Sequence, residues 1–185
     1  MCAASRRLES LGAIEAALWR ELEAAAHDAA HAWRTPVLAT VDGDRADART
    51  VVLREVDAGK RRLVIYTDAR SAKVRQMEHH PEGVLVHWSA ELSWQLRIAV
   101  GLEVTSSGLA VSSRWARLKL SPAAQDYLSP LAPGSPIERP LLERGSREHF
   151  AIIVAQVQAV DWLELHAEGH RRARFDAGGA RWLAP

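Results

Sequence analysis

Residues 49–101 read RTVVLREVDAGKRRLVIYTDARSAKVRQMEHHPEGVLVHWSAELSWQLRIAVG. Valine, leucine, isoleucine and threonine dominate several segments of this stretch, and glycine, aspartate and proline stand between them. That pattern is typical of antiparallel strands joined by short turns. The predicted strands are residues 50–56, 63–67, 83–89 and 92–105. Ser71 is a suitable N-cap and Pro81 ends the segment after it, so a short helix is expected at residues 72–77.

The β pattern continues on both sides of this stretch. Further strands are predicted at residues 37–41, 150–165, 171–176 and 181–183. Apolar residues recur at helical spacing in residues 7–31, and residues 111–120 have the texture of a second helix. Five prolines in residues 121–140 predict a surface excursion without regular structure. The sequence therefore predicts a mainly β protein with helical additions, in which a six-stranded antiparallel sheet closes into a barrel.

Length and composition define the class of protein. The chain has 185 residues, of which 48% are apolar and 25% charged, values that favour one folded domain. We expect a helix within residues 1–33 to pack on a barrel formed by residues 34–185. The net charge of +1 provides no large field for nucleic acid or anionic lipid, so neither partner is expected.

Cysteine usage and hydropathy favour a cytoplasmic protein. Cys2 is the single cysteine, which excludes an internal disulfide and a cysteine-based metal fold. No apolar run in the sequence is long enough to span a bilayer. His27 and His31 have the spacing of two metal ligands on one helix, but no third ligand is identifiable, and ordinary surface histidines are the preferred interpretation. No metal site is predicted.

The densest group of polar and charged residues lies in the opening stretch. Arg49 and Arg54 bracket one predicted strand, and their odd separation directs them to opposite faces unless a bulge intervenes. Ser71 and Lys73 stand at the start of a predicted helix, where free N–H groups and the helix dipole favour an anion. From the residues alone, this group is either a phosphate site or a set of solvated cations on the barrel surface.

The succession RTVVLREVD, LVIYTDARSAKVRQMEHHPEGVLVHW and LSWQLRIAVG resembles the FMN-binding split-barrel family typified by pyridoxamine 5'-phosphate oxidase. In that family, the strand with the R-x-V-x-[LF]-[RK] pattern lies along the flavin, and the S-x-K helix start meets the phosphate. The resemblance extends from about Arg34 to the C-terminus and implies an FMN-binding split β-barrel. It also implies a homodimer with its two flavin sites at the subunit interface.

The resemblance assigns roles to individual residues. Arg49 and Lys73 are the implied ligands of the FMN phosphate, with Thr67 and Ser71 as hydroxyl or backbone partners. The remaining implied cofactor contacts are the backbone of Val51, Val52 and Leu53 at the ring's polar edge, Arg54 and Tyr66 near the flavin, Gln95 at a ring carbonyl, Arg97 as an extra contact, and Arg174 from the C-terminal strand pair. No catalytic residue is implied, because flavin chemistry does not require a protein acid or base when the substrate amine is already neutral.

This chain also departs from the oxidase pattern. Ala72 replaces the arginine before the helix-start lysine, and Leu163 replaces a tryptophan near the cofactor. The helix that binds substrate phosphate in the oxidase reads here Val111-Ser-Ser-Arg-Trp-Ala-Arg-Leu118, without the family's tyrosine. The FMN site is therefore expected to be kept and the pyridoxamine phosphate site is not. In these respects the chain is similar to the uncharacterised FMN-binding relatives of the oxidase.

The expected function is FMN-dependent oxidoreduction, with hydride transfer between a small substrate and FMN. Oxidation of an amine or alcohol and reduction of an acceptor by a nicotinamide both fit this expectation. A flavin-binding or haem-binding module with little turnover is an alternative from a different class. A barrel that binds no cofactor is the third interpretation.

Overall fold

The structure is a computed structural model that describes residues 7–140 and 144–185. Its helices are α1 (Leu11–His27), α2 (Ala72–His79) and α3 (Leu109–Leu118), with 3₁₀ turns η1 (Ala32–Arg34), η2 (Pro122–Tyr127) and η3 (Arg147–His149). Its strands are β1 (Val37–Asp42), β2 (Arg45–Thr50), β3 (Leu53–Asp57), β4 (Arg62–Asp68), β5 (Glu82–Ser89), β6 (Trp94–Thr105), β7 (Phe150–Glu164), β8 (Arg171–Asp176) and β9 (Gly179–Leu183).

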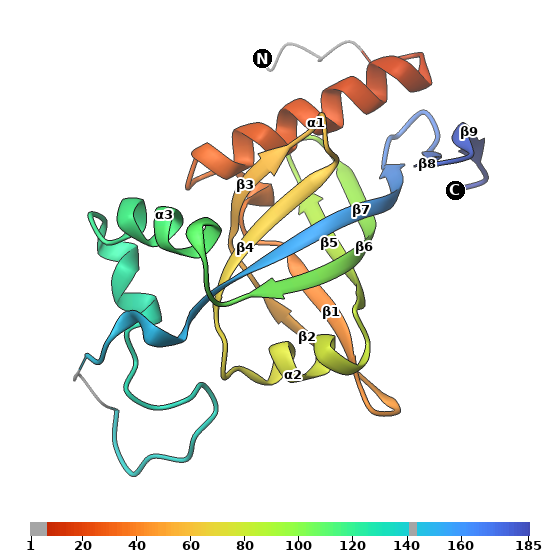
Figure 1. Cartoon of the computed structure of the whole chain (residues 1–185). Helices are drawn as coiled ribbons and strands as arrows, with labels where there is room; N and C mark the ends of the chain where they lie inside the picture. Colours follow the sequence, from red (N-terminus) through yellow and green to blue (C-terminus); the bar gives the residue numbers. More distant parts are fainter. Residues whose placement is uncertain (1–6, 141–143) are drawn as a thin grey trace.

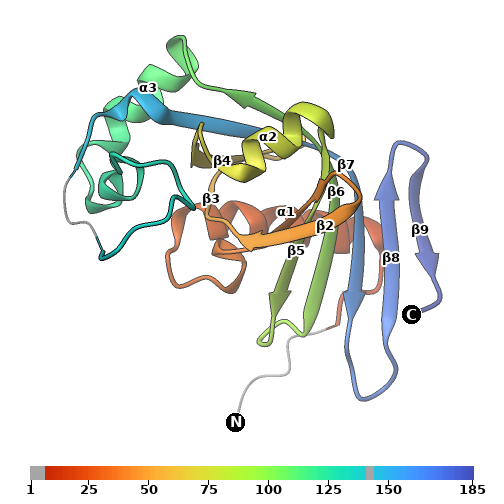
Figure 2. The ribbon, with the colours of Figure 1, turned by 90° about the horizontal axis from the view of Figure 1, so that it is seen from below.

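All described strands belong to one antiparallel sheet. Seven of them follow the order β2-β1-β5-β6-β7-β4-β3, and the hairpin β8–β9 extends the sheet from the end of β7. The sheet curls into a barrel, with α1 across one end and α2 at the other (Figure 1). Seen along the barrel, β8 and β9 stand outside it as a projecting ribbon (Figure 2). The predicted mainly β class is confirmed, but the predicted count of six strands is too low.

The one strand that was not predicted lies in the region between residues 42 and 57. Residues 45–50 form β2, which the sequence analysis did not predict, and the predicted strand at residues 50–56 is broken after Thr50. The Val51 N–H still donates to the carbonyl oxygen of Pro36, 2.9 Å away, which extends the pairing with β1, whereas Leu53 begins a new pairing with Ile65 on β4. Arg49 and Arg54 therefore lie on different strands rather than at the two ends of one.

Two helical predictions also differ from the structure. The first helix begins at Leu11, because the Ser10 side chain accepts a hydrogen bond from the Ala13 N–H, and it ends at His27. It is therefore shorter than the predicted residues 7–31. The Pro-rich excursion, predicted to have no regular structure, contains the 3₁₀ turn η2.

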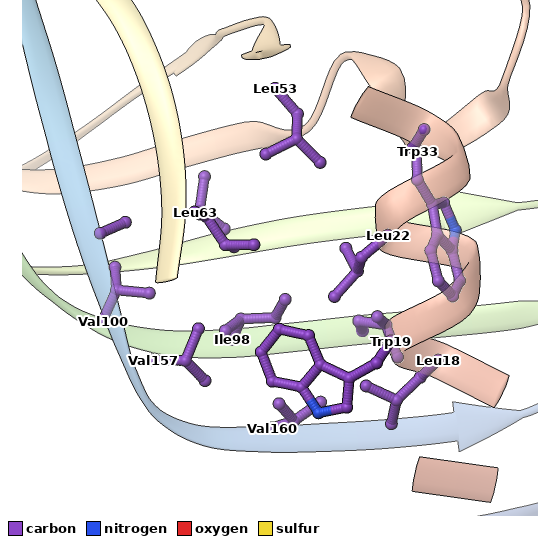
Figure 3. Packing of buried hydrophobic residues seen from close by; sticks show 14 of the residues in the cluster. Leu18, Trp19, Leu22, Trp33, Leu53, Leu63, Ile98, Val100, Val157 and Val160 are labelled. Carbon is purple, nitrogen blue, oxygen red and sulfur yellow. The ribbon is translucent and has the colours of Figure 1, made fainter. Parts of the chain in front are cut away.

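The main core lies between α1 and the inside of the barrel. Ile14, Leu18 and Leu22 are completely buried and pack in one cluster with inward side chains of the strands. Figure 3 shows Leu18 and Leu22 within this cluster. Burial of each such side chain contributes roughly 1.5–3 kcal/mol. The domain boundary at residue 33 remains a prediction, since α1 and the barrel share this core.

A second apolar cluster lies outside the barrel. Trp115 from α3 and Tyr127 from η2 pack against Phe150 at the start of β7, with ring centroids 5.2 and 5.4 Å apart. This cluster fixes α3 and η2 on the outer face of β4 and β7. None of the helices in residues 7–140 and 144–185 combines the length and apolar character needed to cross a membrane.

Candidate functional site

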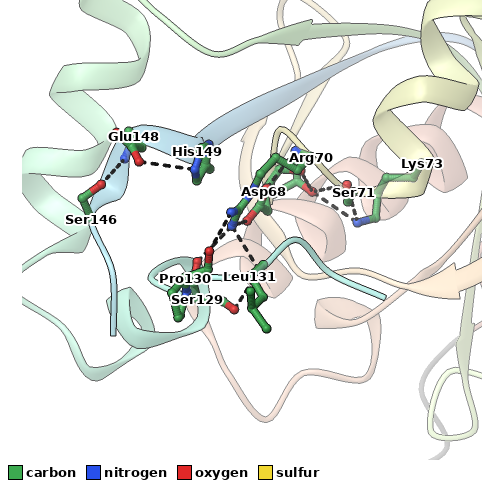
Figure 4. A network of polar contacts seen from close by, with 11 residues as sticks. Asp68, Arg70, Ser71, Lys73, Ser129, Pro130, Leu131, Ser146, Glu148 and His149 are labelled. Carbon is green, nitrogen blue, oxygen red and sulfur yellow. Dashed lines mark hydrogen bonds and ion pairs between the residues drawn. The ribbon is translucent and has the colours of Figure 1, made fainter. Parts of the chain in front are cut away.

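Three predicted site residues converge where β4 ends and α2 begins. The Lys73 Nζ lies 3.2 Å from both the Thr67 Oγ1 and the Ser71 Oγ, and the two hydroxyl oxygens are 3.3 Å apart. Ser71 occupies the N-cap position of α2, but its hydroxyl makes no capping bond and is turned towards Lys73 (Figure 4). We call Arg49, Thr67, Ser71 and Lys73 the cradle.

Lys73 is a cation in a partly dry environment. Burial lowers its pKa below the ordinary lysine value, and the positive charge of Arg49 lowers it further. Its hydrogen bonds go to hydroxyl groups rather than to a carboxylate. An anion bound beside Lys73 would relieve both effects, so these donors suit a phosphate group.

Arg49 approaches from β2, on the same sheet face as Leu38. Its guanidinium donates to the Thr40 Oγ1 at 2.6 Å, to the Asp47 Oδ2 at 2.5 Å and to the Gln76 Oε1 at 2.8 Å. Sequence analysis missed Thr40, Asp47 and Gln76. The one available signal was the position of Gln76 three residues after Lys73, which places both side chains on the same side of α2.

A second ion pair adjoins the cradle on the other side. The Asp68 carboxylate, which is buried, accepts hydrogen bonds from Arg70, and the Asp68 pKa is lowered by these bonds although burial acts in the opposite direction. Arg70 also donates to the backbone carbonyl groups of Ser129, Pro130 and Leu131 (Figure 4). The Pro-rich excursion is thus attached to the residue that directly precedes Ser71.

Arg54 and Tyr66 do not join the cradle. The register of β3 against β4 shifts between Leu53 and Glu55, and this bulge places Arg54 and Glu55 beside Tyr66 on the outer face. The Arg54 guanidinium lies 5.7 Å from the Tyr66 ring centroid and donates to the Tyr127 hydroxyl at 3.0 Å. Arg54 therefore lies on the opposite sheet face from Arg49, as their odd separation predicted, although a strand break and a bulge lie between them.

Glu55 is the shared hydrogen-bond acceptor of Arg114 and Tyr66 on the outer face of the sheet. It accepts two hydrogen bonds from Arg114 on α3, at 2.9 and 2.6 Å, and one from the Tyr66 hydroxyl at 2.8 Å. Burial and the Glu55 carboxylate together raise the pKa of Tyr66 to about 12. Tyr66 is therefore a neutral hydrogen-bond donor throughout the physiological range.

Val51 and Val52 form the connection between β2 and β3, and Leu53 is the first residue of β3. Val51 and Leu53 are buried, and the Val51 N–H is already bonded to Pro36. Of the three peptides that were predicted to meet the ring's polar edge, the one at Val51 thus already has a protein partner for its N–H.

Gln95, Arg97 and Arg174 lie on the sheet face opposite to Arg49. Residues that pair directly across two strands share a face of the sheet. Arg97 on β6 pairs with Asp161 on β7, and Asp161 pairs with Arg174 on β8, so all three lie on one face. Arg97 also pairs with Val86, which pairs with the exposed Val37, so Arg97 lies on the outer face. Leu38, which pairs with Arg49, is completely buried on the inner face. The predicted site residues therefore form three groups that do not meet within one chain.

Metal chemistry has little support in this arrangement. The His31 Nε2 lies 3.0 Å from the Glu21 carboxylate, and His31 stands outside α1, so it does not share a helix with His27. Within residues 7–140 and 144–185, no three histidine, cysteine, aspartate or glutamate side chains are placed to hold a metal ion.

Comparison with known proteins identifies the family. Residues 16–106 match the model of a protein family described as "pyridoxamine 5'-phosphate oxidase, FMN-binding domain". The pyridoxine/pyridoxamine 5'-phosphate oxidase of Xanthomonas euvesicatoria is 32% identical over 173 residues, which cover 92% of this chain and 77% of the relative. This chain belongs to the pyridoxamine 5'-phosphate oxidase FMN-binding family. The cofactor of this family is FMN, which confirms the resemblance stated from the sequence.

Solved structures agree with the family assignment. A pyridoxamine 5'-phosphate oxidase-related, FMN-binding protein from Nostoc punctiforme matches over the full length of both chains, with a TM-score of 0.74 and 26% identity. PhzG from Burkholderia lata matches 99% of this chain and all of its own, with a TM-score of 0.76 and 16% identity, and so shows the fold alone. The split-barrel class expected for the family is therefore confirmed.

Proposed function

We propose that the protein is an FMN-dependent oxidoreductase that transfers hydride between a small substrate and FMN. The cradle carries this proposal, because Lys73 is a half-buried cation with hydroxyl partners beside a second cation, Arg49. Together with the first N–H groups of α2, these donors match the needs of a phosphate monoester. Bound FMN supplies a two-electron acceptor and donor.

The residues of this chain would bind and orient the cofactor. Arg49, Thr67, Ser71 and Lys73 would hold its phosphate, and Arg54 and Tyr66 would lie near the flavin together with the peptides of Val52 and Leu53. The layer formed by Tyr66, Tyr127 and the Arg114–Glu55 pair would limit access of water from the outer face. The substrate and the direction of hydride transfer are left open by this proposal.

We further propose that the protein is a homodimer in which Gln95, Arg97 and Arg174 complete the site of the second copy. These three side chains cannot reach the cradle of their own chain, because they lie on the opposite sheet face. The same outer face has exposed apolar side chains, Val37, Val41 and Trp88. An exposed apolar patch rimmed by charge is typical of an interface.

The first experiment is an absorbance spectrum of the purified protein, followed by mass spectrometry of the compound that heat releases. The expected result is about one FMN per chain. Arg49→Ala and Lys73→Ala should each weaken FMN binding by about 10- to 100-fold, the contribution of a charge-assisted hydrogen bond. Arg45→Ala, on the same strand but almost fully exposed, and Lys60→Ala are matched controls that should retain FMN.

Each outcome discriminates between the interpretations. A colourless protein that takes up no added FMN contradicts the proposal, and full FMN affinity in both cradle variants contradicts the phosphate assignment. A flavin-loaded protein that neither consumes oxygen with amines nor is reduced by nicotinamides would instead be a binding module with little turnover.

A further inference from the structure

Gln76 is a buried polar residue on α2 whose side-chain amide makes three hydrogen bonds to β1 and β2. Its Oε1 accepts from the Thr40 hydroxyl at 2.6 Å and from the Arg49 Nη2 at 2.8 Å, and its Nε2 donates to the Asp47 Oδ2 at 2.8 Å. It is 5% exposed. A buried amide is costly when it lacks hydrogen-bond partners, and here its partners are Arg49 and two of the residues around that guanidinium.

The same contacts fix the orientation of Arg49. Its Nη1 donates to the Leu38 carbonyl and the Thr40 hydroxyl, and its Nη2 donates to Asp47 and Gln76. Both terminal nitrogens are therefore held by the protein, and the Nε–H is left for another acceptor. A guanidinium that is held before the anion arrives loses no conformational freedom when the anion binds.

Gln76 also connects Arg49 to the helix that carries Lys73. The two residues are three positions apart on α2, so one helix carries both the amide that fixes Arg49 and the ammonium group of the cradle. Asp47 is half-exposed, and hydrogen bonds from Gln76 and Arg49 lower its pKa, which keeps it an ionised acceptor.

We infer that Gln76, with Thr40 and Asp47, is a positioning residue that holds Arg49 at the cradle and thereby sets the preference for a phosphorylated flavin. This inference rests on the proposed function. The competing interpretation is that Gln76 only stabilises the packing of α2 on β1. In that case its removal lowers stability and changes the binding of all flavins equally.

The test compares FMN with riboflavin, which lacks the phosphate, in fluorescence titrations of the flavin-free protein. Gln76→Ala should reduce the FMN-to-riboflavin affinity ratio by about tenfold, with riboflavin affinity unchanged. Thr40→Val, which removes one hydroxyl at nearly constant shape, should reduce the ratio in the same direction by less. Met77→Ala is the matched control, because Met77 is the next residue of α2, is equally buried, and has no part in the contacts of Arg49. It should lower thermal stability and keep the ratio.

A double-mutant cycle shows whether Gln76 acts through Arg49. In an Arg49→Ala background, adding Gln76→Ala should not change the ratio further. Additive losses, or a wild-type ratio in Gln76→Ala, would overturn the inference while the phosphate site stands. A wild-type protein that binds FMN no more tightly than riboflavin would contradict the phosphate site of the proposed function, and the inference with it.

Discussion

His87 shows how one residue couples the core to pH. It lies on β5 with its Nδ1 3.2 Å from the Trp33 carbonyl oxygen, so this nitrogen is the donor and the Nε2 is a bare acceptor. The Nε2 is buried without a partner. Burial lowers the pKa of His87 to about 4, and the nearby His31 acts in the same direction.

The lowered pKa predicts a loss of stability in mild acid. The unfolded chain binds a proton at His87 near pH 6.5, whereas the folded chain does so near pH 4, so folding is favoured most above pH 6.5. The free energy of unfolding should fall by about 2 kcal/mol between pH 7.5 and pH 5 on account of this residue. Chemical denaturation at both pH values measures the difference.

Two variants separate His87 from other titrating groups. His87→Asn keeps a donor for the Trp33 carbonyl but does not titrate, so its stability should depend less on pH by the same amount. His27→Gln, at an exposed position, should follow the wild type. An unchanged pH dependence in His87→Asn would show that His87 does not carry the effect.

The sequence predicted which residues form the cradle, but it did not predict the residues that hydrogen bond to Arg49. Thr67, Ser71 and Lys73 lie within seven residues of one another, so a strand end followed by a capped helix was enough to bring them together. Gln76 meets Arg49 and Thr40 across separations of 27 and 36 residues. No local pattern encodes that contact, because it depends on how α2 packs against β1 and β2.

At the scale of elements, long uninterrupted strands were predicted well and irregular ones were not. The predicted residues 83–89, 92–105 and 150–165 agree with β5, β6 and β7 to within two residues at each end. The region of β2 and β3 failed because its apolar run continues through the break at Val51. Both a single strand and two strands satisfy such a run, and the change of pairing partner from β1 to β4 decides between them.

The Pro-rich excursion provides a prediction at this scale. Arg70 is its main polar attachment near the cradle, through three consecutive carbonyl groups at residues 129–131. Arg70→Ala should therefore release this segment, and chymotrypsin should cleave near Tyr127 and Leu131 several-fold faster than in the wild type. Initial cleavage rates, followed by mass spectrometry of the fragments, provide the measurement.

The control for this experiment is Arg75→Ala. Arg75 is an exposed arginine on α2, so the variant changes the net charge equally and should be cleaved at the wild-type rate. Equal cleavage of the Arg70 variant and the wild type would mean that the apolar packing of Tyr127 and Trp115 alone holds the segment.

At the scale of the whole molecule, the arrangement of charges on the barrel is the basis of the proposed dimer. Arg49 lies on the inner face and Arg174 on the outer face, and the hairpin β8–β9 that carries Arg174 projects from the barrel (Figure 2). The sequence could list both arginines, but it could not show this separation, since the face of each residue depends on the sheet register. In the proposed dimer, the Arg174 of one copy would therefore serve the cradle of the other.

This geometry predicts complementation between two defective variants. Arg49→Ala and Arg174→Ala proteins should each bind FMN weakly. After they are mixed, unfolded and refolded together, about a quarter of the sites should regain wild-type affinity, because half of the dimers are mixed and each mixed dimer has one intact site. Flavin fluorescence titration gives the fraction of restored sites, and native mass spectrometry gives the fraction of mixed dimers. If Arg174 served the cradle of its own chain, every site of a mixed dimer would lack one arginine and no affinity would return. A monomeric protein would give the same negative result, and its mass would identify it.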